Sequence, residues 1–227
     1  LISGTIFWRE PSFATLFVIS VIIASTISIG IEITRLLGSE ATLALFTGRY
    51  RRPRLEDRVV LFADIVGSTA LAERIGDLRF HEFLSDVAID LAAPVERARG
   101  VVHRYVGDEV IVTWRLSQKN ACDRSLACAS AMHAALDQVS ERYIARFGVA
   151  PRLRISIHCG QVAAGEIGDW KKEIALLGDT MNTAARIEGA ARDFGARTVL
   201  SHNVANRLSQ EVMATLSPLP AYAAKGK

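Results

Sequence analysis

The first pattern along the chain is an uncharged apolar run near the amino terminus. Residues 12–31 contain no charged side chain; Arg9 and Glu10 precede them, and Glu32 and Arg35 follow. About 20 apolar residues are enough for a helix to cross the hydrocarbon core of a bilayer. An amphipathic helix of a soluble protein would show a polar face, which this run lacks. We predict a transmembrane helix, with a buried helix or a dimer-interface helix as the alternatives.

Beyond this run, strand and helix signals alternate along the chain. Strands are expected at 59–65, 101–106, 109–115, 152–161, 172–177 and 197–201, and helices at 68–76, 78–98, 119–147, 179–193 and 202–210. Pro94 falls inside the second of these helices and is expected to kink or end it. Alternating strands and helices with two hairpins predict an α+β domain, in which flanking helices cover one face of an antiparallel-rich sheet.

Composition and charge narrow the class of protein. Half of the 227 residues are hydrophobic, 22% are charged and the formal net charge is +3, which suits one domain plus the apolar segment. This near-neutral charge gives no support for binding nucleic acid, which usually needs a strong basic stripe. The three cysteines form neither a disulfide framework nor a zinc pattern, so we expect them reduced and buried.

The distribution of arginines predicts how the apolar helix is oriented. Only Arg9 precedes it, whereas six arginines follow within the next 27 residues: Arg35, Arg49, Arg51, Arg52, Arg54 and Arg58. By the positive-inside rule, the carboxyl-terminal side is cytoplasmic. The segment between helix and domain is interpreted as either a coupling element or a passive spacer. Because the chain starts at Leu1 rather than Met, we also expect it to be part of a longer protein.

Candidate chemistry begins where the first predicted strand ends. The apolar run that begins at Val59 contains a single carboxylate, Asp64, near its end. Gly67-Ser68-Thr69 follows it, at the start of a predicted helix. A carboxylate in this position suits a cation, and the backbone N–H groups of a helix start suit an anion. The combination favours a metal–nucleotide site. The alternative is that Asp64 only caps the turn before the helix.

Two later motifs strengthen the hypothesis of a metal site. Gly107-Asp108 divides two strand-like runs and predicts a hairpin with a carboxylate at its tip. Two carboxylates on neighbouring strands can hold two divalent ions, which activate an attacking oxygen and neutralise a leaving phosphate. Asn182 and Arg186 are four residues apart, so they share one face of the predicted helix 179–193.

Together these motifs resemble a known catalytic signature. FADIVGST around Asp64, RYVGDEV around Asp108 and LGDTMNTAARIE around Asn182 and Arg186 are similar to the signature of the class III nucleotidyl cyclases. The match extends in order from Arg58 to Lys227. It implies a ferredoxin-like βαββαβ cyclase fold that works as a dimer and converts a nucleoside triphosphate into its 3′,5′-cyclic monophosphate and pyrophosphate. With the apolar helix in front, the chain resembles the membrane-anchored bacterial type.

The resemblance also implies roles for individual residues. Two divalent ions, Mg²⁺ or Mn²⁺, would be held by Asp64, Asp108 and the carbonyl of Ile65. The β- and γ-phosphates would meet the backbone of the turn formed by Val66, Gly67, Ser68 and Thr69. Arg186 would stabilise charge on the α-phosphate, and Asn182 would orient the ribose. In this family the aspartates come from one subunit and the Asn/Arg pair from the other, which implies a homodimer.

The base pocket departs from the family pattern. Where the family has its adenine-reading lysine this chain has Arg104, and where the family has the partner Asp or Thr it has Ala175. Arg104 can donate to adenine N1 or guanine O6, whereas Ala175 has no side-chain acceptor, so Glu173 is a possible substitute. Lys225 or Lys227 corresponds to the family's late phosphate-binding lysine, unless both belong to a disordered tail.

We therefore expect a transmembrane helix with flanks at 1–35, a helical and basic linker at 36–57 and a cyclase domain at 58–227. The expected function is an adenylate cyclase in the inner membrane of a bacterium, with its catalytic domain in the cytoplasm. Two alternatives stay open: a guanylate cyclase, and a weak or inactive nucleotide-binding or dimerisation module. A P-loop kinase is excluded because no GxxxxGK[ST] motif occurs.

Overall fold

A computed structural model describes residues 12–222 of the chain. Residues 1–11 and 223–227 lie outside the described part, and with them the two candidate phosphate-binding lysines, Lys225 and Lys227. The chain divides into two compact units, Leu1–Arg49 and Tyr50–Lys227, which are considered separately below.

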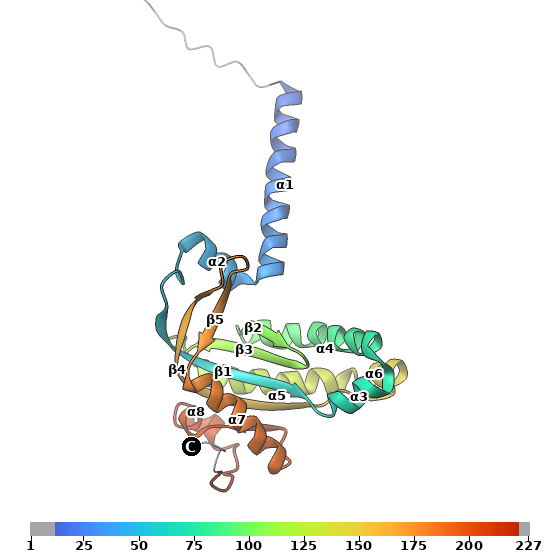
Figure 1. The fold of residues 1–227 in the computed structure, drawn as a ribbon, viewed down its shortest axis with the longest axis vertical. Helices are drawn as coiled ribbons and strands as arrows, with labels where there is room; N and C mark the ends of the chain where they lie inside the picture. The colour runs from blue at the N-terminus through green and yellow to red at the C-terminus, as the bar shows by residue number, and fades with distance from the viewer. Residues whose placement is uncertain (1–11, 223–227) are drawn as a thin grey trace, which may run out of the picture. The chain divides into compact units, whose positions relative to one another are not determined.

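The first unit consists of helix α1 (Phe13–Leu37) and helix α2 (Ser39–Thr47) (Figure 1). Helix α1 begins after Ser12, whose hydroxyl accepts a hydrogen bond from the Thr15 N–H at 3.3 Å and so caps the helix. Within it, Phe13–Thr34 has a mean hydropathy of 2.3 and no buried side chain. By length and composition, this stretch can cross a membrane.

Three hydroxyl groups of α1 are bonded to the helix backbone itself. Ser20, Thr26 and Thr34 each donate to a carbonyl three or four residues earlier, at 2.8 Å. In hydrocarbon an unsatisfied hydroxyl would be costly, whereas a bond back to the helix satisfies it locally. These three hydroxyl groups are therefore compatible with an apolar surrounding.

The second unit alternates strands and helices. In chain order its elements are β1 (Arg54–Ile65), α3 (Ser68–Ile75), α4 (Asp77–Arg97), β2 (Val101–Val106), β3 (Glu109–Arg115), α5 (Ala121–Gln138), α6 (Ser140–Phe147), β4 (Leu153–Ile167), β5 (Glu173–Leu177), α7 (Asp179–Asp193), β6 (Thr198–Leu200), α8 (His202–Ala205) and α9 (Gln210–Met213). Their sheet runs in the order β2-β3-β1-β4-β5 with antiparallel neighbours, and β6 pairs in parallel with the first half of β4. The predicted α+β class is confirmed.

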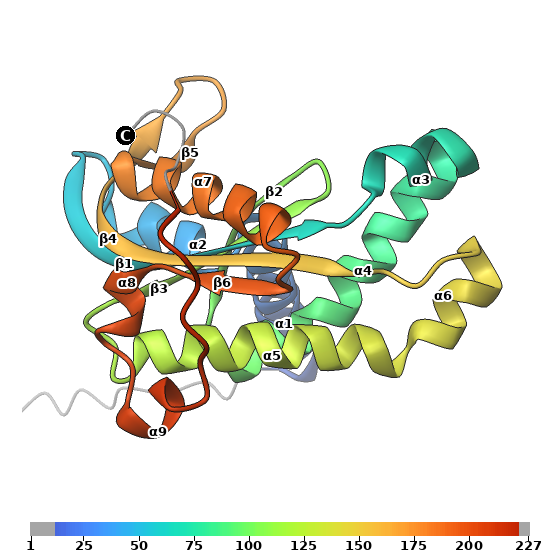
Figure 2. The ribbon, with the colours of Figure 1, turned by 90° about the horizontal axis from the view of Figure 1, so that it is seen from below.

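Helices cover both faces of the sheet rather than the single face that the sequence pattern predicted. Val59, Leu61 and Ala63 of β1 belong to the main core, which α4 and α5 help to build, whereas Val60 and Phe62 pack with Ala184 of α7. Figure 2 shows α5 and α7 on opposite sides of the sheet. A strand buried on both faces is continuously apolar, which explains the run at the end of β1.

Several element boundaries differ from those predicted. Strand β1 begins at Arg54, five residues earlier than expected, and the helix expected at 119–147 is divided into α5 and α6 at Val139. Helix α4 continues through Pro94 to Arg97, because a proline in the last turn removes only one backbone hydrogen bond. The helix expected at 202–210 is reduced to the short α8, with α9 starting at Gln210.

Close packing positions α7 on β4. Gly160 leaves room for Thr180, whose Oγ1 would lie 2.6 Å from a Cβ at that position and donates instead to the Gln161 carbonyl at 2.7 Å. The buried Ser156 donates to the carbonyl of Ala184 at 2.8 Å. His158 on the same face of β4 hydrogen-bonds Ser201 at 2.8 Å, which fits the structural role expected from its place in the alternation.

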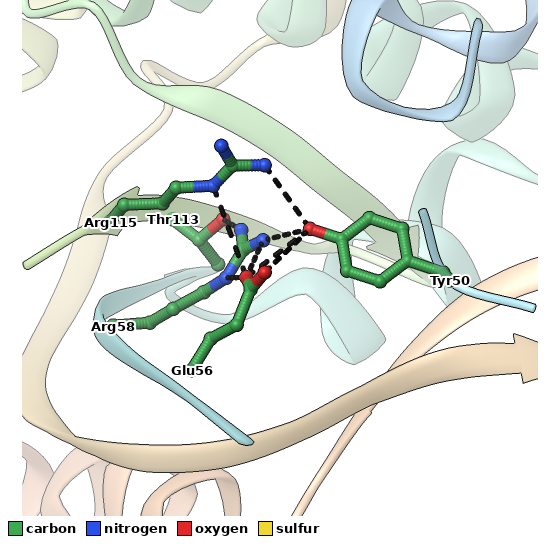
Figure 3. A network of polar contacts seen from close by, with 5 residues as sticks. All are labelled: Tyr50, Glu56, Arg58, Thr113 and Arg115. Atoms are coloured by element: carbon green, nitrogen blue, oxygen red, sulfur yellow. Dashed lines mark hydrogen bonds and ion pairs between the residues drawn. The ribbon is translucent and has the colours of Figure 1, made fainter. Parts of the chain in front are cut away.

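A buried polar network lies where the chain enters the second unit (Figure 3). The Arg58 guanidinium is 1% exposed and donates to Glu56 at 2.7 Å, to the Tyr50 hydroxyl at 2.9 Å and to Thr113 at 3.1 Å. Arg115 reaches the same hydroxyl at 3.2 Å. The network thus fastens the first residue of the unit to strands β1 and β3.

Candidate active site

Two carboxylates meet at one end of the sheet. Asp64 is the penultimate residue of β1, and Asp108 lies at the tip of the β2–β3 hairpin, next to Gly107 with its positive φ of 61°. Strand β3 pairs with β1 through Ala63 and Val110, which brings the hairpin tip beside Asp64. Asp108 lies close enough to Asp64 to raise the pKa of its carboxyl group. The structure therefore brings these two predicted residues together.

This end of the sheet concentrates negative charge. Burial, the contact with Asp108 and the charge of Glu188 raise the pKa of Asp64 to about 7, while Arg154 opposes the shift. Burial and the charges of Glu188 and Asp108 likewise raise the pKa of Glu109 to about 7. Carboxylates that resist ionisation in this way are stabilised in their charged form by a cation.

A partly buried arginine links Asp64 to α7. Arg154 of β4 pairs with Asp64 in the strand register, and its Nη1 lies 3.4 Å from Asp64 Oδ2 and 3.6 Å from Glu188 Oε1. Sequence reasoning missed Arg154, Glu188 and Glu109. A signal for Glu188 did exist, since it lies one helical turn after the buried Ala184 and is thus a charge on the sheet-facing side of α7.

The predicted phosphate turn has the expected form at three of its four positions. Gly67 adopts a left-handed conformation with φ 76°, and α3 begins at Ser68 with no side chain capping it. The first N–H groups of a helix lack partners within the helix, so those of Ser68 and Thr69 are suited to an anion. Val66 differs, because its N–H already donates to the Arg152 carbonyl at 2.8 Å.

The predicted base pocket contains an ion pair. Arg104 of β2 donates to the carboxylate of Glu173 at the start of β5, and the two side chains are 41% and 48% exposed. Ala175 is 7% exposed and lies two residues further along β5, so it shares a strand face with Glu173. Glu173 therefore presents a carboxylate on the same strand face as Ala175.

Asn182 and Arg186 lie on α7 and are not brought to the carboxylates. Within residues 12–222, neither forms a hydrogen bond or ion pair with Asp64 or Asp108. Arg186 forms no ion pair with any side chain of that part of the chain. Its guanidinium is thus available to an anionic partner from outside.

The residues present fit a divalent cation whose remaining ligands are waters or substrate phosphates. Among the described residues no cluster of three or more His, Cys, Asp or Glu side chains can hold a metal ion. Mg²⁺, however, is commonly bound by one or two carboxylates together with substrate phosphates, and Asp64 and Asp108 provide that number. A cavity of about 320 Å³ adjoins Asp108 and is also lined by Ile65, Glu109 and residues of α4; Asp64 is not among its lining residues.

Comparison with known proteins identifies the family. Residues 51–227 match the model of the adenylate and guanylate cyclase catalytic domain. Adenylate cyclase 2 of Rhizobium meliloti (strain 1021) is 38% identical over 197 residues, which are 87% of this chain and 54% of that protein. An adenylate cyclase of Anabaena cylindrica is 29% identical over 155 residues, 66% of this chain and 30% of that protein. The chain thus spans about half or less of the length of these relatives.

Solved structures support the same fold. A bacterial light-regulated adenylyl cyclase is similar with a TM-score of 0.70 at 18% identity, over 90% of this chain and 61% of that one. The chain belongs to the class III adenylate and guanylate cyclase catalytic domain family, as the sequence motifs indicated.

Proposed function

We propose that the chain is a membrane-anchored adenylate cyclase that converts ATP into 3′,5′-cyclic AMP and pyrophosphate at a homodimer interface. One observation carries the proposal: Asp64 and Asp108 meet at the end of the sheet, whereas Asn182 and Arg186 lie on α7 without contact to them. Each chain thus carries one aspartate pair and one Asn/Arg pair. When two copies pair, the aspartates of one chain and the Asn/Arg pair of the other form a complete site. The Rhizobium and Anabaena relatives, both named adenylate cyclases, support this reaction.

In the proposed reaction the ribose 3′-oxygen loses its proton to solvent and forms a bond to the α-phosphorus. The bond between the α-phosphorus and the oxygen that bridges it to the β-phosphate breaks, and this oxygen leaves as part of pyrophosphate. Two Mg²⁺ or Mn²⁺ ions held by Asp64, Asp108 and the Ile65 carbonyl would activate the attacking oxygen and neutralise the leaving pyrophosphate. Arg186 of the second chain donates to the α-phosphate, because a guanidinium stays charged and can bind two oxygens at once. Asn182 orients the ribose, and the N–H groups of Gly67, Ser68 and Thr69 face the outer phosphates.

The adenylate cyclase relatives support ATP as the preferred substrate, and the base pocket leaves GTP as a second one. Arg104 donates to N1 of adenine, and Glu173 accepts from the exocyclic amine. The same carboxylate can also accept from the N1–H and amino group of guanine, with Arg104 donating to O6, so this ion pair is the observation that keeps guanylate cyclase activity as a candidate.

Helix α1 is the proposed membrane anchor. Its 22-residue apolar stretch suits a bilayer, and the arginines that follow support a cyclase domain in the bacterial cytoplasm.

Product analysis tests the proposal. The purified chain in detergent is incubated with ATP or GTP and Mn²⁺, and the cyclic products are separated. We expect cyclic AMP from the parent and none from Asp64→Ala or Asp108→Ala, since each variant removes a metal ligand but no core side chain. Circular dichroism checks that the variants are folded. Activity within a few-fold of the parent in either folded variant would contradict the two-metal site.

A further inference from the structure

Arg154 stands between the carboxylate pair and α7. Its side chain is 14% exposed, as is that of Glu188, and that of Asp64 is 20% exposed. Charges at this depth are screened less by water and salt than a surface pair. Neither ion pair is therefore an incidental surface contact.

The charges around Arg154 are unbalanced. Four carboxylates, those of Asp64, Asp108, Glu109 and Glu188, influence one another at this end of the sheet. Arg192 also reaches Glu188, at 3.6 Å, but is 65% exposed. In the described part of the chain, the ion pairs of Asp64 involve Arg154 alone. Arg154 is therefore the resident counter-charge of the proposed metal ligand.

We propose that Arg154 is a positioning residue that forms an ion pair with Asp64 while no divalent cation is bound. When a cation binds, Asp64 leaves Arg154 and coordinates the cation, and Arg154 keeps its ion pair with Glu188. This inference rests on the proposed function, because it takes Asp64 as a metal ligand. A guanidinium has five donors in a planar fork and can serve two carboxylates at once. After the exchange its charge remains paired with Glu188, so no buried charge is left alone.

The exchange makes Arg154 and Glu188 act in opposite directions on metal affinity. Arg154 competes with the cation for Asp64 and repels it, whereas Glu188 attracts the cation and receives the displaced guanidinium. A residue that merely supports the fold would weaken metal binding when removed. The sign of the change therefore separates the two roles.

Binding of Mn²⁺ alone provides the test. The full chain in detergent is titrated with Mn²⁺ without nucleotide, and free Mn²⁺ is followed by electron paramagnetic resonance. We expect Arg154→Gln to bind Mn²⁺ about tenfold more tightly, since a charge within a few ångströms shifts such equilibria by about one order of magnitude or more. Arg192→Gln is the matched control: it removes an arginine from the same Glu188 without touching Asp64, and its affinity should stay near that of the parent.

Two further variants keep the inference testable if Arg154→Gln does not fold. Arg154→Lys retains the charge and should bind Mn²⁺ with nearly parental affinity. Glu188→Gln should bind Mn²⁺ several-fold more weakly, because the guanidinium then has only Asp64 as a partner. Unchanged affinity in Glu188→Gln, or unchanged or weaker affinity in folded Arg154→Gln, overturns the inference.

Asp64→Ala distinguishes this failure from failure of the proposed function. If that variant binds Mn²⁺ like the parent, Asp64 is not a metal ligand, and the metal site itself is wrong. If it loses Mn²⁺ binding while Arg154→Gln binds like the parent, the metal site stands and only the role of Arg154 is wrong.

Discussion

Arg58 carries a full charge at a position that is 1% exposed. An isolated buried charge would be prohibitively costly, so the guanidinium depends on the carboxylate of Glu56 and the hydroxyls of Tyr50 and Thr113. Such a cluster is costly to assemble and even more costly to break, since removal of one member leaves the others buried without their partner. The network therefore fixes the start of β1 in a single arrangement.

Arg58→Ala is expected to destabilise the chain strongly. The variant leaves Glu56 without its main partner, and breaking a buried ion pair in this way costs about 3–5 kcal/mol. Urea unfolding followed by tryptophan fluorescence measures the change in the free energy of unfolding. Arg197→Ala is the control, because Arg197 pairs with Asp137 at 3.2 Å on the surface, where such a pair contributes about 1 kcal/mol or less. Equal losses in the two variants would contradict the importance of the network.

At the scale of elements, the contact between β2 and β5 is the least expected feature. The two strands lie at opposite ends of the strand order, yet Arg104 and Glu173 form an ion pair across them. Strand β4 makes this possible: its first half pairs with β6 and its second half with β5, so the sheet curls toward β2 (Figure 1). The curl assembles a candidate base pocket from residues that are about 70 positions apart.

Substitutions in this pocket should change the choice of base. Arg104→Ala is expected to raise KM for the preferred nucleotide. Glu173→Ala should raise the preference for ATP over GTP, because the carboxylate accepts two hydrogen bonds from guanine but only one from adenine. Ala175→Asp should sharpen that preference, because one restored hydrogen bond typically shifts selectivity by about 1–3 kcal/mol. Competition between ATP and GTP measures the ratio of the two kcat/KM values. The control is Lys172→Ala, next to Glu173 but paired with Glu166. A ratio unchanged in all three variants would show that the base is bound elsewhere.

Most local elements could be predicted from the sequence, because they depend on near neighbours. The hairpin at Gly107-Asp108 and the helix with Asn182 and Arg186 lie where turn chemistry and periodicity placed them. The division of α5 from α6 could not be predicted in this way, since no glycine or proline occurs at Val139. It reflects tertiary packing: Tyr143 and Phe147 of α6 pack edge-on against Phe83 of α4.

Long-range pairing limited what could be predicted of the site. The two carboxylates could be proposed because each ends a recognisable local motif. Arg154 could not be proposed, because its role depends on the register that sets it opposite Asp64, 90 residues away. That register cannot be deduced from the sequence of either strand alone. The covering of both sheet faces was missed for a similar reason: the burial of Val60 and Phe62 depends on where α7 returns to the sheet.

At the scale of the whole molecule, the proposed enzyme needs two chains. Among the described residues, the carboxylates and the Asn/Arg pair of α7 form no hydrogen bond or ion pair with one another, and the proposed function assigns them to two complementary sites of a dimer.

Mixing two inactive variants tests this arrangement directly. Asp64→Ala lacks a metal ligand and Arg186→Ala lacks the cation for the α-phosphate, so each homodimer should be inactive. In a heterodimer both lesions fall in the same site, and the other site combines an intact Asp64 with an intact Arg186. Random pairing of equal amounts makes about half of the dimers heterodimers with one working site each, so we expect roughly a quarter of the parental cyclic AMP production.

Crosslinking of differently tagged chains verifies that heterodimers form. The control mixes Asp64→Ala with Asp108→Ala, which should stay inactive if both aspartates serve the same site from one chain, because each site of that heterodimer then lacks one ligand. If the first mixture remains inactive although heterodimers are present, the two halves do not act across the interface.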